Sequence, residues 1–264
     1  MFETIRLETD ARGVATLTLN RPDKHNAMSA QMIAELTSAC ADLAGDRAVR
    51  AVVLAANGRS FCAGGDLGWM RDQMEADAAA RQEQAGALAG MLGAFNRLPQ
   101  FTIAAVSGNA FGGGLGLISV CDMAIAAEDV QFALSETRLG LIPATIGPYV
   151  QARTGAGPAR RIFLHSRPFD TDEAQRLSLI ARAVPAEDLA QAVEAEIAAL
   201  LACAPGAVAQ AKALIRELRA PVDAAQITRS IEALTRRWES EEASAGIAAF
   251  FDRQPPPWAP YTAS

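Results

Sequence analysis

The chain has 264 residues, of which half are hydrophobic and a fifth are charged, and its formal net charge is −6. A chain of this length can bury a sizeable core as one large domain. Its acidic balance leaves no broad basic surface, which argues against nucleic acid or an anionic membrane as a partner. No apolar run approaches the ~20 residues of a membrane helix, and MFETIRLETD lacks the apolar core of a signal peptide. We therefore expect a globular protein of the cytoplasm.

Strand and helix patterns alternate along the first half of the chain. Residues 14–19 alternate between two faces, which is typical of a half-buried strand, and a helix is predicted to begin after Ser29, a good N-cap residue. Three further runs of strand length lie at 49–56, 101–106 and 122–127. Strands that alternate with helices predict an α/β core with parallel pairing.

The last third of the chain is rich in alanine, has helical spacing and contains no convincing strand. Apolar side chains recur on two helical faces, one within 208–218 and one within 227–238. Such faces pack either against the same chain or against a second subunit, and the pattern leaves both alternatives open.

Two glycine-rich segments each follow a predicted strand: FCAGGDL at 61–67 and GNAFGGGLG at 108–116. Glycine permits unusual φ values and lets a ligand approach backbone N–H groups closely. Residues 115–120 predict a buried helix, whose N-terminus would direct unpaired N–H groups at a ligand. The dinucleotide fingerprint fails because Leu117 stands where its third glycine belongs, and no lysine follows the glycines as a phosphate-binding loop requires. The four cysteines show no CxxC pairing, and we expect neither a disulfide framework nor a metal site.

A third segment, FALSETRLGLIP at 132–143, places Glu136 among apolar residues. One interpretation is a carboxylate in a solvated turn that pairs with Arg138. The other is a partly desolvated carboxylate whose raised pKa suits general acid–base catalysis near neutral pH.

The combination of AGGDL, GNAFGGG and SETRLGLIP, in this order and spacing, resembles the enoyl-CoA hydratase/isomerase (crotonase) superfamily. The resemblance covers nearly the whole chain. It implies an α/β fold, the crotonase (ClpP-like) spiral of ββα turns with a C-terminal helical region. It assigns residues 1–200 to a spiral core with the acyl-CoA site, and residues 201–264 to a helical region for trimerisation and active-site cover. It also implies a homotrimer or homohexamer (a dimer of trimers), an acyl-CoA substrate, and no cofactor apart from the coenzyme A of that substrate.

By motif matching, the resemblance places an oxyanion hole on the backbone N–H groups of Gly65 and Gly113, and an acid–base catalyst on Glu136. Two preorganised amides stabilise an enolate oxygen as its charge develops, and loss of one such donor can cost ~3 kcal/mol of barrier. The family usually has alanine at Gly65, a change we expect to be tolerated because the backbone N–H does the work. The other matched positions are expected to bind the substrate or its coenzyme A: Lys24, His25, Ala27, Ala63, Asp66, Leu67, Phe111, Gly112, Leu141 and Pro143. Trp69, Phe250 and Phe251 are expected either to line the acyl pocket or to pack in the core.

The chain departs from the two-glutamate hydratases of this family at Gly116, where they carry a second glutamate. One carboxylate suits the family's isomerases, in which a single glutamate moves a proton between two carbons. It also supports hydration if another group holds the water. Longer segments resemble a bacterial branch of methylglutaconyl-CoA and isohexenylglutaconyl-CoA hydratases, whose substrates carry a second carboxylate. Arg138 and Arg153 are candidates to bind it. We favour a hydratase, with an enoyl-CoA isomerase or a non-catalytic acyl-CoA-binding protein as alternatives.

Overall fold

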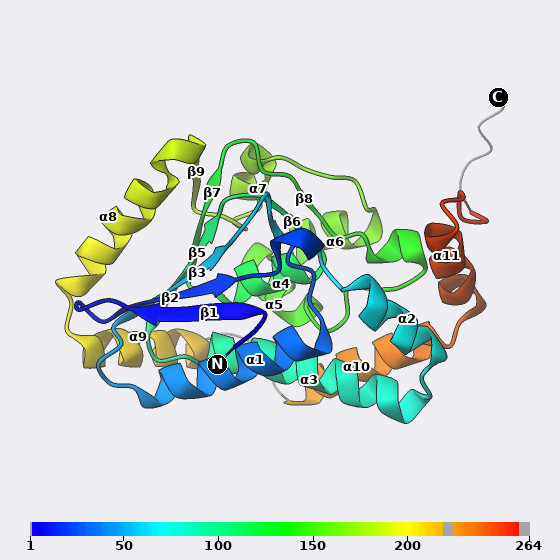
Figure 1. Ribbon diagram of the computed structural model, residues 1–264, viewed down its shortest axis with the longest axis horizontal. Helices are drawn as coiled ribbons and strands as arrows, with labels where there is room; N and C mark the ends of the chain where they lie inside the picture. The colour runs from blue at the N-terminus through cyan, green and yellow to red at the C-terminus, as the bar shows by residue number, and fades with distance from the viewer. Residues whose placement is uncertain (1, 219–223, 259–264) are drawn as a thin grey trace.

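A six-stranded sheet forms the centre of the protein (Figure 1), in a computed structural model that describes residues 2–218 and 224–258. Its order is β1-β2-β3-β5-β7-β9, and only the β1–β2 pair is antiparallel among the described strands. The bounds are β1 (Ile5–Thr9), β2 (Val14–Leu19), β3 (Ala51–Ala56), β5 (Phe101–Val106), β7 (Met123–Ala127) and β9 (Arg182–Val184). The predicted parallel core is confirmed, although the strand expected at 49–56 begins two residues later.

A second sheet consists of three short parallel strands in the order β4-β6-β8. They are β4 (Ser60–Cys62), β6 (Asn109–Phe111) and β8 (Phe132–Ala133). Each directly follows a strand of the large sheet, so the chain supplies one strand to each sheet and then enters helices. This repeat is the predicted spiral of ββα turns. The short strands were not predicted because two or three residues are too few to establish an alternating pattern.

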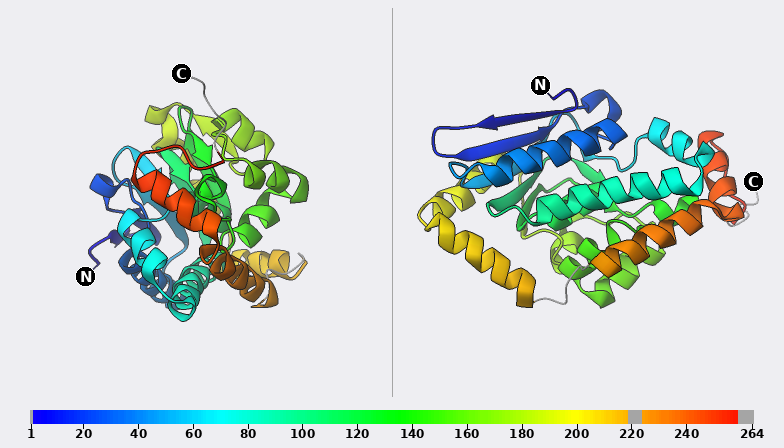
Figure 2. Two further views of the ribbon diagram at one scale, coloured as in Figure 1. Left: turned by 90° about the vertical axis from the view of Figure 1, so that its right-hand side faces the viewer. Right: turned by 90° about the horizontal axis from the view of Figure 1, so that it is seen from below.

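Long helices cover the strands on one side of the molecule. Helix α3 (Ala78–Asn96) packs between α1 (Ala30–Gly45) and α10 (Ala224–Trp238), as Figure 2 shows. Helix α1 begins as predicted, because the Ser29 side chain accepts a hydrogen bond from the Met32 N–H. The remaining helices of the core are α2 (Leu67–Glu75), α4 (Gly113–Val120), α5 (Gly147–Thr154), α6 (Ala156–Leu164), α7 (Thr171–Arg176) and α8 (Leu189–Leu201), with short 3-10 turns at Pro22–Lys24, Glu136–Leu139 and Ala186–Asp188.

The two apolar faces predicted in the last third behave differently. Helix α10 buries Leu234 and Trp238, so its face packs within the chain. On α9 (Pro205–Leu218) the buried residue is Lys212, whereas Leu214, Ile215 and Leu218 are 52%, 59% and 77% exposed. The interpretation that the apolar face of α9 packs against its own chain is therefore wrong within the described residues. Helix α11 (Glu241–Phe251) completes the chain order, and the predicted region 201–264 also includes 219–223 and 259–264, which lie outside the described residues.

Neither a membrane-spanning helix nor a metal cluster stands out in the described part of the chain. No single described helix is long and apolar enough to cross a membrane, although the bent pair at 186–201 and 205–218 passes that test of length and composition when taken together. The same residues contain no group of three or more His, Cys, Asp or Glu side chains placed to hold a metal ion.

Candidate active site

The three segments singled out in the sequence follow the three strands of the small sheet. Gly65 comes after β4, Gly113 after β6 and Glu136 after β8. Parallel strands present their carboxyl ends at one edge, where ligands of α/β proteins commonly bind. Because β6 is the central strand, Gly113 lies between the segments that carry Gly65 and Glu136.

Two glycines turn the backbone at this edge. Gly64 and Gly112 have φ values of +93° and +48°, a region that side chains with a Cβ rarely adopt. Gly112 donates its N–H to the Ala133 carbonyl at 2.9 Å, and helix α4 begins at the next residue. The N–H groups of Gly65 and Gly113 donate to no acceptor among the described residues. Two backbone donors, one of them at a helix N-terminus, are thus left for a ligand.

The segments touch one another. A Cβ built on Gly112 would lie 3.1 Å from Glu136 Oε1 and 3.6 Å from Gly64 Cα. A Cβ on Gly113 would lie 1.8 Å from Met28 Cε. Met28 also pairs with the first glycine loop, donating its N–H to the Gly64 carbonyl at 2.8 Å. Met28 therefore joins the two glycine loops, a role that no sequence pattern indicates, because an apolar side chain carries no chemical signal.

Glu136 begins a 3-10 turn at the same edge. Its Oε2 is buried and has no hydrogen-bond partner among the described residues. Burial raises the pKa of this carboxyl group to about 7, and the N–H groups of Glu136 and Ser135 offset part of that rise. No ion pair joins Glu136 to Arg138 within the described chain. The geometry thus favours the desolvated acid–base carboxylate over the solvated turn.

Glu136 and the glycines line a largely apolar cavity of about 380 Å³. The predicted positions that line it are Gly65, Gly113, Glu136, Ala63, Leu67, Gly112, Leu141 and Pro143. Trp69 and Phe250 also line it, together with Leu234 and Trp238 of α10. A larger and more open hollow of about 780 Å³ lies beside α5, α6 and α10, but neither the glycines nor Glu136 line it. We take the smaller cavity as the candidate site because it combines apolar walls with converging polar groups.

Five predicted binding positions lie outside the cavity lining: Lys24, His25, Ala27, Asp66 and Phe111. Lys24 is exposed, and Nδ1 of His25 lies 3.1 Å from Ser60 Oγ. Phe111 ends the central strand of the small sheet. Phe251 is expected near the acyl pocket or in the core. The guanidinium carbon of Arg71 lies over its ring, 4.3 Å from the centroid of that ring.

Asp66 supports the first glycine loop instead of lining the cavity. Its Oδ1 accepts from the Gly68 N–H at 2.8 Å as the N-cap of α2, and its Oδ2 forms an ion pair with Arg21 at 2.9 Å. Arg21 also donates to the Ala27 carbonyl at 2.7 Å. The pair therefore ties the loop to the turn that contains Lys24.

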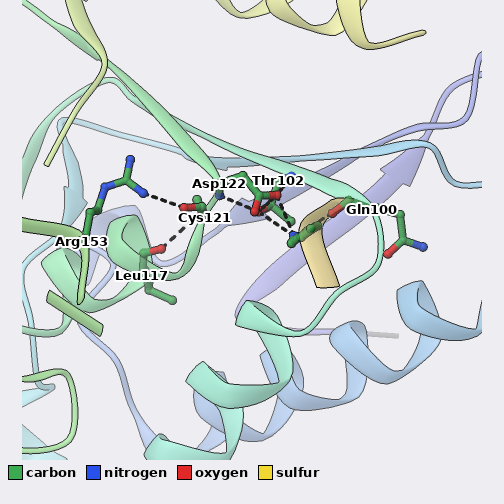
Figure 3. Close-up of polar contacts among 7 residues, drawn as sticks. Gln100, Thr102, Leu117, Cys121, Asp122 and Arg153 are labelled. Carbon is green, nitrogen blue, oxygen red and sulfur yellow. Dashed lines mark hydrogen bonds and ion pairs between the residues drawn. The ribbon is translucent and has the colours of Figure 1, made fainter. Parts of the chain in front are cut away.

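The two candidate arginines have different environments. Arg138 lines the cavity, where it and Glu136 are the charged side chains among the described lining residues. Arg153 does not line it: its Nε donates to the Leu179 carbonyl at 2.7 Å. Its Nη1 donates to the Cys121 carbonyl at 2.7 Å (Figure 3). The structure therefore leaves Arg138 as the candidate for a second substrate charge.

Gly116 lies three residues after Gly113 on α4 and has no room for a side chain. A Cβ there would lie 2.5 Å from Ile146 Cγ2 and 3.6 Å from Leu92 Cδ2. The place where two-glutamate relatives carry a carboxylate is thus covered by Ile146.

Comparison with known proteins agrees with this architecture. A family model described as enoyl-CoA hydratase/isomerase matches residues 9–260. A probable enoyl-CoA hydratase, echA8 of Mycobacterium bovis, is 33% identical over 258 residues, which cover 97% of each chain. Among solved structures, a putative enoyl-CoA hydratase of Mycobacterium avium paratuberculosis is 32% identical with a TM-score of 0.84, covering 97% of this chain and 99% of its own. Pseudomonas aeruginosa AtuE is 40% identical with a TM-score of 0.80, covering 97% of this chain and 100% of its own. The chain belongs to the enoyl-CoA hydratase/isomerase family.

Proposed function

We propose that this protein is an enoyl-CoA hydratase that adds water across the double bond of a 2-enoyl-CoA thioester. The observation that carries the proposal is the convergence of two uncommitted backbone amides and one unpaired carboxylate on a single apolar cavity. Relatives named as enoyl-CoA hydratases support the same class of reaction.

The reaction follows from the charges that these groups can stabilise. Water attacks the β carbon as Glu136 takes one of its protons, and the double-bond electrons move onto the thioester oxygen. The N–H groups of Gly65 and Gly113 stabilise that enolate oxygen as its charge develops. Glu136 then delivers the proton to the α carbon, which completes the addition and regenerates the carboxylate. A carboxyl group with a pKa of about 7 can act as base and acid in turn at neutral pH.

We further propose that the acyl chain is branched and carries a second carboxylate, as in 3-methylglutaconyl-CoA. Arg138 supports this substrate class because it lines the cavity and makes no ion pair within the described residues. A guanidinium group binds a carboxylate through two parallel hydrogen bonds. The exposed Lys24 supplies a point charge for the phosphates of coenzyme A outside the cavity.

A second candidate function is isomerisation between 3-enoyl and 2-enoyl thioesters. The observation that favours it is the packing of Ile146 over Gly116, which leaves Glu136 as the carboxylate of the described cavity lining. One carboxylate can carry a proton from the α carbon to the γ carbon without water.

Glu136→Gln tests the proposal. Purified protein is assayed for loss of enoyl absorbance with 3-methylglutaconyl-CoA and crotonyl-CoA, and for gain of conjugation with a 3-enoyl-CoA. We expect hydration that falls at least about 100-fold in Glu136→Gln, because the amide cannot accept the proton. Glu128→Gln, an exposed glutamate outside the cavity, is the matched control. Gain of conjugation without hydration would identify an isomerase, and binding without any reaction would identify an acyl-CoA-binding protein.

The proposal extends to a homotrimer or a dimer of trimers in the cytoplasm. The exposed apolar side chains Leu214, Ile215 and Leu218 on α9 support an assembly in which a second copy covers them.

A further inference from the structure

If the protein is the hydratase proposed above, a single carboxylate leaves one hydrogen of the attacking water without an acceptor. The inference below rests on that proposed function. Glu136 takes one proton of the water. The other hydrogen needs a partner that fixes the oxygen lone pair toward the β carbon, since misplacement by about 1 Å costs up to about 100-fold in rate.

Few side chains in the cavity lining can accept that hydrogen bond. The indole N–H groups of Trp69 and Trp238 are donors only, and so is the guanidinium of Arg138. Two side-chain hydroxyls line the cavity, those of Ser135 and Thr145. Ser135 immediately precedes Glu136 and so shares its wall of the cavity. Thr145 comes from a different segment, after the 3-10 turn that Glu136 begins.

Thr145 combines burial with a free hydroxyl. The residue is 5% exposed, and its Oγ1 makes no hydrogen bond to any described residue. Its Oγ1 is not one of the fully buried side-chain atoms that lack a partner, so the hydroxyl keeps access to the cavity that the residue lines. A hydroxyl on the wall of an apolar cavity is unfavourable unless water or a ligand satisfies it.

The segments that carry Glu136 and Thr145 pack on neighbouring positions at the start of helix α4. Glu136 lies against Gly112, the residue before the helix, and Ile146, the neighbour of Thr145, lies against Gly116. Gly113, a proposed oxyanion donor, lies between these two positions in the sequence.

We propose that Thr145 is a positioning residue that accepts a hydrogen bond from the attacking water and orients it between Glu136 and the β carbon of the substrate. The water oxygen forms the new bond to carbon, one water proton passes to Glu136, and the other remains on the product hydroxyl, directed at Thr145 Oγ1. Ile146 packs over Gly116, and Thr145 thereby supplies the second contact that the missing carboxylate would have made.

Thr145→Val tests this role, because valine has the shape of threonine without the hydroxyl. Hydration of a 2-enoyl-CoA and isomerisation of a 3-enoyl-CoA are measured on the same preparations, since only hydration uses the water. We expect hydration to fall about 10-fold to 100-fold while Glu136-dependent isomerisation changes less than about threefold. Thr145→Ser should recover most of the hydration rate. Thr154→Val is the matched control, because Thr154 is also buried but bonds the Val150 carbonyl away from the cavity.

Each other outcome has a distinct meaning. An equal fall in both reactions, or no fall in hydration, would overturn the role of Thr145. Loss of hydration in Ser135→Ala but not in Thr145→Val would assign the water contact to Ser135 instead. A wild-type protein that isomerises without hydrating would overturn the proposed function and this inference together.

Discussion

At the scale of single residues, the protonation of Glu136 is the property that decides activity in the proposed hydration. The group lies in an apolar cavity, and burial raises its pKa to about 7. Hydration begins with the charged carboxylate as base. The active form of the free enzyme is therefore lost as the pH falls below about 7, whereas an ordinary glutamate would stay charged down to about pH 4.5.

We predict that kcat/KM for hydration rises about tenfold per pH unit below about pH 7 and reaches a plateau above it. The measurement is a series of initial rates between about pH 5 and pH 9 at low substrate concentration, with circular dichroism at each pH to confirm folding. A midpoint near pH 4.5 would show that Glu136 is solvated in the free enzyme. A profile that falls between pH 6 and pH 8 would mean that the protonated acid starts the reaction.

The residue scale also shows what sequence could and could not predict about the site. Glycine density and a carboxylate among apolar residues, both visible in one dimension, single out the segments, and the family resemblance places Gly65, Gly113 and Glu136 within them. The sequence does not predict the contacts of Met28 and Ile146, because these join segments distant in the chain. The place of Thr145 in the cavity lining is likewise seen in the fold alone. An apolar side chain that fills the space over a glycine leaves no local pattern.

At the scale of elements, the short strands of the small sheet position the residues of the candidate site more directly than the long strands of the large sheet do. The sequence predicts the strands of the large sheet because six apolar residues make a clear run. The small sheet, whose strands have two or three residues, carries the three segments of the candidate site at its carboxyl edge. Its strands depend on pairing with one another, so tertiary contacts and not local propensity determine them.

Asp66 has two contacts beside the first glycine loop: it caps helix α2, and it forms an ion pair with Arg21. Two substitutions separate the contributions of these contacts to stability. Asparagine keeps a good N-cap for α2 but removes the charge that pairs with Arg21, whereas alanine removes both contacts. We predict that Asp66→Asn lowers the free energy of unfolding by about 1 kcal/mol and Asp66→Ala by about 2 kcal/mol. Urea unfolding measures both. Equal losses would show that the cap contributes nothing beyond the ion pair, and an Asp66→Asn variant as stable as the wild type would show that the ion pair contributes nothing.

At the scale of the whole molecule, the C-terminal helices both complete the cavity and bind to the end of the central sheet. Helix α10 supplies Leu234 and Trp238 to the cavity, and α11 supplies Phe250. The contact with the sheet comes from α9, where Lys212 forms an ion pair with Asp122 at 2.6 Å and donates to the Gln100 carbonyl at 2.8 Å. Asp122 also accepts hydrogen bonds from the N–H and Oγ1 of Thr102 (Figure 3). Asp122 lies two residues after the end of helix α4, which begins at Gly113.

Lys212 is an unusual anchor because it is buried. Burial lowers its pKa, and the charge of Asp122 opposes that shift, so the ammonium ion depends on its partner. A buried ion pair contributes little over an apolar pair of the same shape, but removal of one partner leaves an uncompensated charge. The contact therefore joins α9 to the residues that directly precede β5 and β7.

We predict that Lys212→Met lowers the free energy of unfolding by about 1 to 3 kcal/mol, below the usual cost for a buried pair because Asp122 keeps a side chain that is 28% exposed. The double variant with Asp122→Asn should recover part of that loss, since it removes the stranded charge. Urea unfolding of the four proteins forms a double-mutant cycle. Because neither residue lines the cavity, kcat of the folded protein should change less than about twofold. Additive losses without coupling would show that Lys212 acts through its stem and not its charge. A large fall in kcat would instead mean that the register of α9 is transmitted to the walls that α10 and α11 contribute.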